Sequence, residues 1–213
     1  MNRQLQLIQF ARWPRPGRVK TRLEPELGVN GALQAHIRLT LTVMARLQAS
    51  GHPLQLVWDE PLVTPPAESR PILDALARHD IQTGLQQGAN LGERMIHALS
   101  TALGHADRAM IIGSDCPSVD ASYIEQARVL LDQADVVFGP SDDGGYVLIG
   151  ARRTAPDMLS GVAWGTSGAL TQSICATERS GLSVALLPPR WDVDEPADWY
   201  RFIRFMAQSE SGG

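Results

Sequence analysis

The only lysine of the chain lies in a segment whose residue types suit the binding of phosphate. Lys20 is the single lysine among 19 Lys and Arg residues, and it follows Gly17 in a stretch rich in arginine. Lysine presents a compact ammonium on a flexible stem, whereas arginine presents a rigid planar fork, so lysine suits a point contact with a polyphosphate. Gly17 lets the backbone come close to a ligand. The segment predicts a phosphate-binding loop, with a solvated basic turn as the alternative. Its basic residues are Arg12, Arg15, Arg18, Lys20 and Arg22.

A carboxylate suited to a metal ion follows a second apolar run. Asp115 follows residues 109–113 after a single serine, and those residues are apolar and typical of a buried strand. Mg²⁺ binds through one or two carboxylates together with substrate phosphates, so an aspartate at the end of a strand suits it. Capping of the next helix or turn is the alternative role of Asp115.

Two further carboxylates alternate around a valine near the C-terminus. In an extended segment Asp192 and Asp194 project to one side of Val193, where they repel each other unless a cation or solvent intervenes. We expect at least one of them to bind metal. The alternative is that Asp194 caps a helix that begins near Pro196.

Two glycine-containing loops are candidates for substrate contacts. The sequence Asp143-Gly144-Gly145-Tyr146 suits either a plain hairpin turn or a loop that reads substrate hydroxyl groups. In residues 87–94, Asn90 and Glu93 resemble a helix N-cap, which leaves Gly88 and Arg94 free to contact a base or a phosphate.

Other catalytic chemistries find little support. The five histidines show no metal-ligand or catalytic-triad spacing, and no G-x-S-x-G nucleophile motif is present. Cys116 has no evident paired base, and Cys116 and Cys175 form neither a metal motif nor a redox pair.

Composition limits the class of partner. The chain has 213 residues, 44% hydrophobic and 20% charged, with a net charge of −4. This charge attracts neither nucleic acid nor an anionic membrane, so the local basic segment favours a small anionic ligand. No apolar stretch reaches membrane-spanning length, and we expect a soluble cytoplasmic protein.

The elements that must position these residues alternate between strand and helix. This alternation predicts a mostly parallel sheet covered by helices on both faces, with ligands at the carboxyl ends of the strands. The expected strands are residues 5–10, 54–58, 81–85, 109–113, 135–138, 146–149 and 183–187. The expected helices are 31–49, one that includes 72–77, 91–103, 121–131, 167–177 and one after Pro196.

Four ordered segments resemble those of the bacterial DUF2064 family. They are Phe10 with residues 16–23, then residues 113–117, 143–146 and 192–196. The family is often provisionally labelled an rSAM/selenodomain-associated glycosyltransferase. The resemblance implies the GT-A fold of the nucleotide-diphospho-sugar transferases, a Rossmann-like α/β/α sandwich. It implies one such domain over residues 1–207, with a flexible tail at 208–213.

The resemblance also implies roles for individual residues. The loop with Lys20 is similar to the nucleotide loop of 2-phospholactate guanylyltransferases and, less closely, of molybdenum cofactor guanylyltransferases. Asp115 corresponds to a single-aspartate metal site, whereas sugar-transferring enzymes usually carry D-x-D there, and here residue 113 is glycine. The implied catalytic residues are Lys20, Arg22 and Asp115; the nucleotide-binding residues are Phe10, Arg12, Gly17, Lys20, Arg22, Gly88 and Arg94. The implied acceptor residues are Asp143, Gly144, Gly145, Tyr146 and Trp164, and the metal ligands are Asp115, Asp192 and Asp194.

These expectations favour a nucleotidyltransferase dependent on Mg²⁺ or Mn²⁺. Such an enzyme would join a nucleoside triphosphate to a phosphorylated or acidic small acceptor and release pyrophosphate. A glycosyltransferase with an NDP-sugar donor is the alternative, and a non-catalytic nucleotide-binding module is the third possibility. Trp164 packs in the core if it does not line the acceptor pocket.

Overall fold

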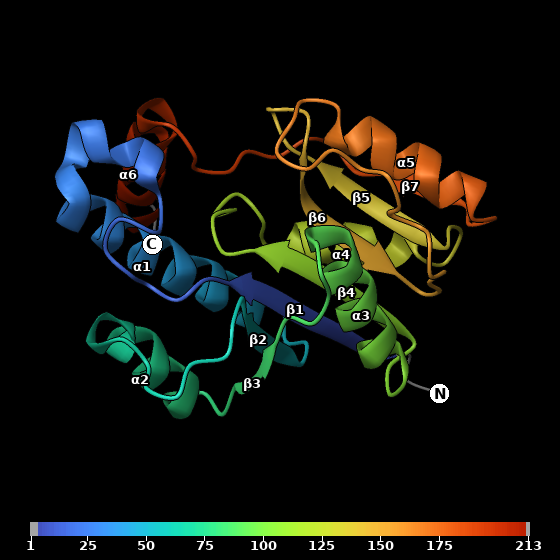
Figure 1. The fold of residues 1–213 in the computed structure, drawn as a ribbon, viewed down its shortest axis with the longest axis horizontal. Helices are drawn as coiled ribbons and strands as arrows, with labels where there is room; N and C mark the ends of the chain where they lie inside the picture. Colours follow the sequence, from blue (N-terminus) through green and yellow to red (C-terminus); the bar gives the residue numbers. More distant parts are fainter. Residues whose placement is uncertain (1–3, 212–213) are drawn as a thin grey trace.

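The computed structural model describes residues 4–211 and contains a seven-stranded sheet with the strand order β3-β2-β1-β4-β6-β5-β7 (Figure 1). All strand pairings among the described residues are parallel except the two made by β6. The prediction of a mostly parallel sheet is therefore confirmed. The strands are β1 (Leu5–Ala11), β2 (Leu54–Trp58), β3 (Gln82–Leu85), β4 (Arg108–Gly113), β5 (Val136–Pro140), β6 (Tyr146–Ala151) and β7 (Val184–Leu186).

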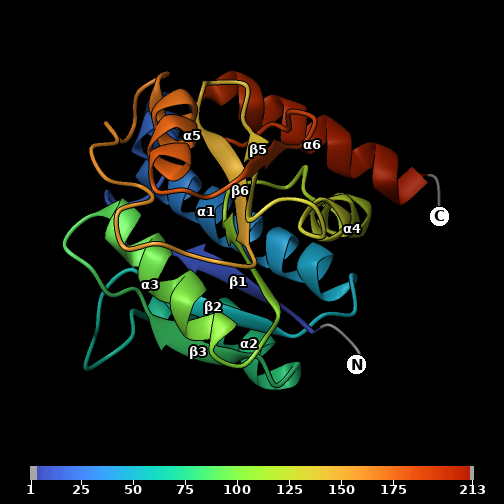
Figure 2. The same cartoon turned by 90° about the vertical axis from the view of Figure 1, so that its right-hand side faces the viewer.

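Helices cover both faces of the sheet (Figure 2). They are α1 (Glu24–Gln48), α2 (Arg70–Arg78), α3 (Leu91–Leu103), α4 (Ala121–Leu130), α5 (Ala169–Arg179) and α6 (Pro196–Ser211), with short 3-10 turns at Thr21–Leu23 and Ala67–Ser69. Successive residues of β4 show the division, because side chains alternate across a strand. Ile112 packs in a core with α1 and α4, and Ile111 packs in a second core with α3 and α5.

Two helices differ most from the sequence-based bounds. Helix α1 begins at Glu24 rather than at residue 31, and it is kinked at Gly28, whose φ of 69° lies outside the helical region. Apolar periodicity could reveal only the part beyond the kink. Helix α6 continues to Ser211, so the tail expected from residue 208 is helical as far as that residue, and residues 212–213 lie outside the described part.

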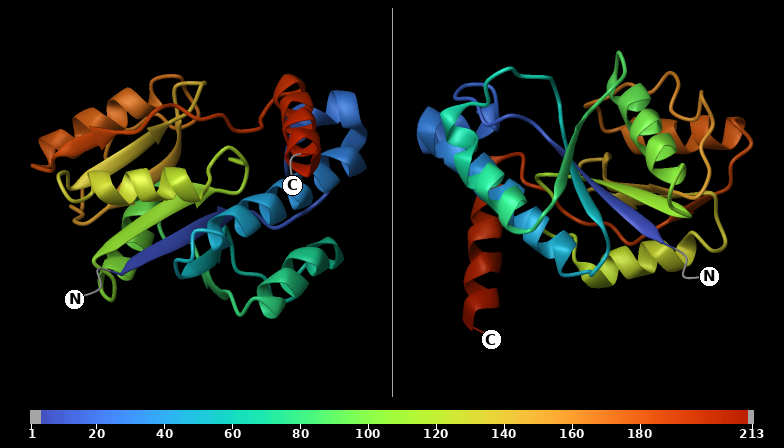
Figure 3. Two further views of the ribbon diagram at one scale, coloured as in Figure 1. Left: turned by 180° about the vertical axis from the view of Figure 1, so that it is seen from behind. Right: turned by 90° about the horizontal axis from the view of Figure 1, so that it is seen from below.

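Helix α6 packs on α1 rather than on the sheet, as the views in Figures 1 and 3 show. Phe202 of α6 and Val193, just before the helix, are fully buried against Leu23 and Leu39. This contact fixes the chain that leads into α6 beside the start of α1. None of the helices within residues 4–211 is long and apolar enough to cross a bilayer.

The turn between β5 and β6 is an antiparallel hairpin, as one of the two alternatives for residues 141–146 predicted. Gly144 has a φ of 88°, and a Cβ atom built on it would lie 2.2 Å from the carbonyl oxygen of Ser167. Leu170 N–H also donates to the Gly144 carbonyl at 3.0 Å. The hairpin turn is therefore pressed against the segment that precedes α5.

We predict that Gly144→Ala destabilises the protein by about 2 kcal/mol more than Gly161→Ala, because overpacking adds to backbone strain. Gly161 is the matched control, since its φ is 75° but no atom lies within 4 Å of its added Cβ. The left-handed backbone alone costs about 1–2 kcal/mol for alanine. Chemical denaturation of the two variants measures the difference, and equal losses would show that Ser167 yields freely.

Candidate functional site

The site begins where β1 and β4 end side by side. In the parallel register of these strands Phe10 pairs with Gly113, so the segments that follow both strands emerge at the same edge of the sheet. The Ser114 hydroxyl donates to the Phe10 carbonyl at 2.8 Å, and the buried amide of Gln9 donates to the Ser114 hydroxyl at 3.1 Å. These bonds hold Asp115 directly beside the loop that carries Lys20.

Lys20 is the centre of the polar contacts at this edge. Its ammonium donates to Asp115 Oδ2 at 2.8 Å, to Asp194 Oδ1 at 2.7 Å and to the Val193 carbonyl at 2.5 Å. Its backbone is left-handed, with a φ of 48°, which is uncommon for a residue with a side chain. The 3-10 turn Thr21–Leu23 starts at the next residue. Three predicted site residues that lie far apart in the sequence thus meet in one place.

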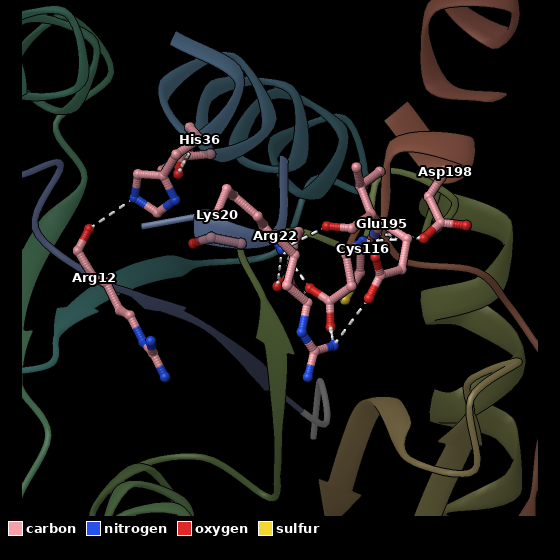
Figure 4. A network of polar contacts seen from close by, with 12 residues as sticks. Arg12, Lys20, Arg22, His36, Cys116, Glu195 and Asp198 are labelled. Carbon is pink, nitrogen blue, oxygen red and sulfur yellow. Dashed lines mark hydrogen bonds and ion pairs between the residues drawn. The ribbon is translucent and has the colours of Figure 1, made fainter. Parts of the chain in front are cut away.

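Asp194 does not act as the cap of α6. Asp198 performs that role, because its Oδ2 accepts from the backbone N–H groups of Asp194 and Glu195 at 3.2 and 2.9 Å. The Asp194 carboxylate instead pairs with Lys20, and its second oxygen lies 3.7 Å from Arg22. Figure 4 shows Lys20, Arg22, Glu195 and Asp198 in this network.

The segment before α6 is tied to two strands. Arg190 N–H donates to the Pro140 carbonyl at 2.9 Å, and Val193 N–H donates to the Asp115 carbonyl at 3.0 Å. The side chain of Val193 is fully buried against α1 and α6. The segment therefore crosses from the end of β5 to the end of β4 with Asp192 and Asp194 on either side of an anchored residue.

A group of carboxylates suitable for a cation lies beside Lys20. Asp143, Asp192 and Asp194 each place an oxygen within 4.8 Å of the others. A donor set made only of carboxylate oxygens fits a hard divalent cation such as Mg²⁺. Asp115 stands outside this group, across the Lys20 ammonium, and Asp143 is a carboxylate that the sequence did not assign to metal.

The charges shift the pKa values of three groups. Burial alone would lower the pKa of Lys20, but Asp115 and Asp194 outweigh it and raise that pKa. Burial alone would raise the pKa of Asp115, but the Lys20 ammonium holds it at about 2. For Asp192, burial and the carboxylates of Asp115, Asp194 and Asp143 act together and raise the pKa to about 7. The carboxylates at this edge together carry more negative charge than Lys20 and Arg22 neutralise.

An open cleft of about 950 Å³ lies along this edge of the sheet. The predicted residues that line it are Phe10, Arg12, Lys20, Arg22, Arg94, Asp115, Trp164 and Asp194. Other predicted residues, all within the described range, lie off the cleft wall: Gly17, Gly88, Asp143, Gly144, Gly145, Tyr146 and Asp192. The structure therefore brings together most of the nucleotide-binding set, but of the acceptor set only Trp164.

Several residues off the cleft wall have packing partners that explain their identity. Gly88 has a φ of 142° and approaches the backbone of Arg94, where an added Cβ would lie 2.7 Å from the amide nitrogen. The Tyr146 ring makes edge contacts with Phe138 and Trp164. Asn90 is the N-cap of α3, as predicted, since its side chain accepts from Glu93 N–H at 3.0 Å.

The cleft wall also contains residues for which the sequence predicted no role. They are Trp13, His36, Asp59, Glu60 and Gln86. Three of them follow β2 and β3 directly, so the rule that selected Asp115 after its strand could have found them. His36 had no signal in the sequence.

His36 connects two elements beside the cleft through a hydrogen bond. Burial lowers the pKa of this imidazole, so the neutral ring donates from Nε2 to the Arg12 carbonyl at 3.0 Å (Figure 4). This bond joins the loop after β1 to α1. The indole of Trp13 packs in the same loop, stacked on Trp58 with ring centroids 3.8 Å apart.

Cys116 is unsuited to act as a nucleophile. Its side chain is buried, and burial together with Asp115 and Asp192 raises the pKa of the thiol. A buried neutral thiol is a poor nucleophile. Both Cys116 and Cys175 are free in the structure.

We predict that Asp192→Asn stabilises the protein at pH 8 but changes its stability little at pH 4. Between about pH 4 and 7 the folded state keeps a proton on Asp192 that the unfolded state has lost, so the free energy of unfolding falls as pH rises through this window. Removal of the charge should recover on the order of 1–3 kcal/mol above pH 7. Denaturation curves with a chelator present provide the measurement.

Asp74→Asn is the matched control, because Asp74 is an exposed carboxylate on α2 that pairs with Arg70 at 2.8 Å. It should change stability little at either pH, because an exposed ion pair contributes little to stability. The same behaviour in Asp192→Asn would contradict the raised pKa.

Comparison with known proteins places the chain in a family. The model of DUF2064, described as an uncharacterized protein conserved in bacteria, matches residues 42–166, which is more than half of the chain. No curated protein matches significantly. A solved structure from Desulfovibrio desulfuricans G20, provisionally assigned as a nucleotide-diphospho-sugar transferase, is 30% identical over 90% of this chain and 82% of that one, with a TM-score of 0.78.

More distant structures share the fold. A nucleotidyl transferase from Methanothermobacter thermautotroptrophicus is 14% identical over 97% of this chain and 99% of that one, with a TM-score of 0.63. A CMP:2-keto-3-deoxy-manno-octonic acid synthetase, solved with CTP, is 11% identical over 97% and 99% of the two chains, with a TM-score of 0.57. The fold is that of the nucleotide-diphospho-sugar transferases, and the chain belongs to the DUF2064 family.

Proposed function

We propose that the protein is a nucleotidyltransferase dependent on a divalent cation. The observation that carries the proposal is the meeting of Lys20 with Asp115 and Asp194 in a cleft at the carboxyl edge of the sheet. In open α/β sheets this edge is where ligands bind. The shared fold of nucleotidyl transferases and of the CTP-bound synthetase supports the same reading.

The cations of the cleft suit a triphosphate. Lys20 would meet the α- and β-phosphates, and Arg12 and Arg22 would hold the outer phosphates. An oxygen of the acceptor's own phosphate or carboxylate would attack the α-phosphorus. The bond from that phosphorus to the bridging oxygen would break, and pyrophosphate would leave with the electron pair. Because the acceptor is the nucleophile, the chain needs only to position both substrates and stabilise charge.

Asp115, Asp192 and Asp194 would hold the divalent cation, with Asp143 near the last two. When bound, Mg²⁺ or Mn²⁺ neutralises charge at the α-phosphate. Trp164 on the cleft wall would contact the acceptor. The turn that leads into β6 would hold Trp164 in place through its contacts with Trp164 and Ser167. This turn consists of Asp143, Gly144, Gly145 and Tyr146.

A glycosyltransferase that uses an NDP-sugar is the second candidate. The provisional assignment of the Desulfovibrio desulfuricans structure favours it. The two reactions differ in their products, because nucleotidyl transfer releases pyrophosphate and glycosyl transfer releases a free nucleoside diphosphate.

We predict that one nucleoside triphosphate with Mg²⁺ stabilises the purified protein, and that Asp115→Asn and Lys20→Ala abolish this gain. A ligand at about 100 times its dissociation constant adds roughly 2.7 kcal/mol to the free energy of unfolding. A thermal-shift panel of nucleoside triphosphates and NDP-sugars measures it, followed by assays for pyrophosphate and nucleoside diphosphate with sugar phosphates as acceptors.

Arg70→Gln is the matched control, since Arg70 is an exposed cation on α2 outside the cleft. It should retain the full shift. Stabilisation by an NDP-sugar alone would favour the glycosyltransferase, and nucleotide binding without either product would favour a non-catalytic module. No response to any nucleotide would contradict the proposal.

A further inference from the structure

The Lys20 ammonium has no N–H group left for a ligand. Its three donors are taken by Asp115, Asp194 and the Val193 carbonyl, at 2.8, 2.7 and 2.5 Å. Only 8% of the side chain is exposed, whereas the carboxylates it joins are 35% and 41% exposed. While it makes these three contacts, this lysine therefore cannot also contact a phosphate.

The ammonium stands where a cation shared by these carboxylates would stand. Asp143, Asp192 and Asp194 already lie within 4.8 Å of one another, and Lys20 bridges Asp115 and Asp194. Mg²⁺ lies only about 2.0–2.1 Å from its ligand oxygens, so a metal that joined Asp115 to Asp194 would need the space that the ammonium fills. Two cations in that space would also repel each other.

From this geometry we infer that Lys20 is the resident counter-ion of the divalent-cation site and must leave it before Asp115 and Asp194 can share a metal. The inference rests on the proposed function, which assigns these carboxylates to metal. A polyphosphate supplies the alternative partner that the ammonium needs once it leaves. Metal and polyphosphate therefore bind cooperatively, because each requires Lys20 to leave its contacts with Asp115 and Asp194.

The exchange follows from charge balance. If Lys20 left and no metal entered, Asp115 and Asp194 would lose the cation that they contact most closely. If a metal entered and no polyphosphate was bound, the buried Lys20 ammonium would lose all three of its acceptors. Since linkage is reciprocal, a polyphosphate that attracts Lys20 raises the affinity for metal by the factor by which metal raises the affinity for polyphosphate. The site thus binds a metal ion more weakly when no polyphosphate is present.

The test measures Mn²⁺ binding by electron paramagnetic resonance of the free ion, in the full chain with and without tripolyphosphate. Each titration is compared with a protein-free one, because tripolyphosphate itself binds Mn²⁺ through its oxygens. We expect wild-type protein to bind Mn²⁺ at least tenfold more tightly when tripolyphosphate is present. Lys20→Met should bind Mn²⁺ alone at least tenfold more tightly than wild type and should lose most of the effect of tripolyphosphate. Thermal denaturation confirms folding, and Lys20→Gln, which keeps polar hydrogens but no charge, is the second variant with the same expected gain.

Arg22→Met is the matched control. It also removes one positive charge, but Arg22 is 64% exposed and lies 3.7 Å from Asp194, so it does not fill the space between the carboxylates. Its affinity for Mn²⁺ alone should rise less than threefold. An equal rise in Arg22→Met and Lys20→Met would show a general field effect and overturn the inference.

The outcomes separate this inference from the proposed function. If wild type binds Mn²⁺ with tripolyphosphate, and Asp115→Asn removes that binding, but neither Lys20 variant gains affinity for Mn²⁺ alone, the counter-ion role is wrong while the metal site stands. If no variant and no added polyphosphate gives Mn²⁺ binding, the metal site of the proposed function fails, and the inference fails with it.

Discussion

Carboxylates that gather at one edge of a sheet must be compensated, and this requirement governs the site. Asp115, Asp143, Asp192 and Asp194 come from three separate segments, and their mutual repulsion is visible in the raised pKa of Asp192. The cation that holds two of them is Lys20, buried and bonded to each. Its left-handed backbone and the 3-10 turn that follows place the ammonium at that point. The loop after β1, the end of β4 and the entry to α6 are thus joined by one charged group.

Much of the fold could be predicted from the sequence because local patterns determine it. The strand at residues 54–58 and the helix at 91–103 have the predicted bounds, since an apolar run and a capped amphipathic segment are both local signals. Asp115 could be selected because it follows a buried strand in a parallel sheet. The family resemblance added the order of the motifs, and the family model, which matches residues 42–166, confirms the family itself.

Other features depend on contacts between distant residues and could not be predicted. Nothing in the local sequence shows that the Lys20 ammonium donates to Asp115 and Asp194. Nor does it show that Asp198, rather than Asp194, caps α6. The edge contacts of the Tyr146 ring with Phe138 and Trp164 join residues from separate segments, so no local pattern predicts them. The start of α1 was placed too late because the kink at Gly28 interrupts the periodicity.

Val193, with an aspartate on each side, links the site to the packing between α1 and α6. The valine side chain is fully buried between α1 and α6, while its carbonyl accepts from Lys20 and its two neighbours carry carboxylates of the acidic group. The packing of α6 on α1 therefore fixes the positions of Asp192 and Asp194, because any shift of this helix along α1 moves both carboxylates with it. Distance from the cleft is then a poor guide to tolerance of substitution, and the α1–α6 contact belongs to the functional unit as much as the residues that line the cleft.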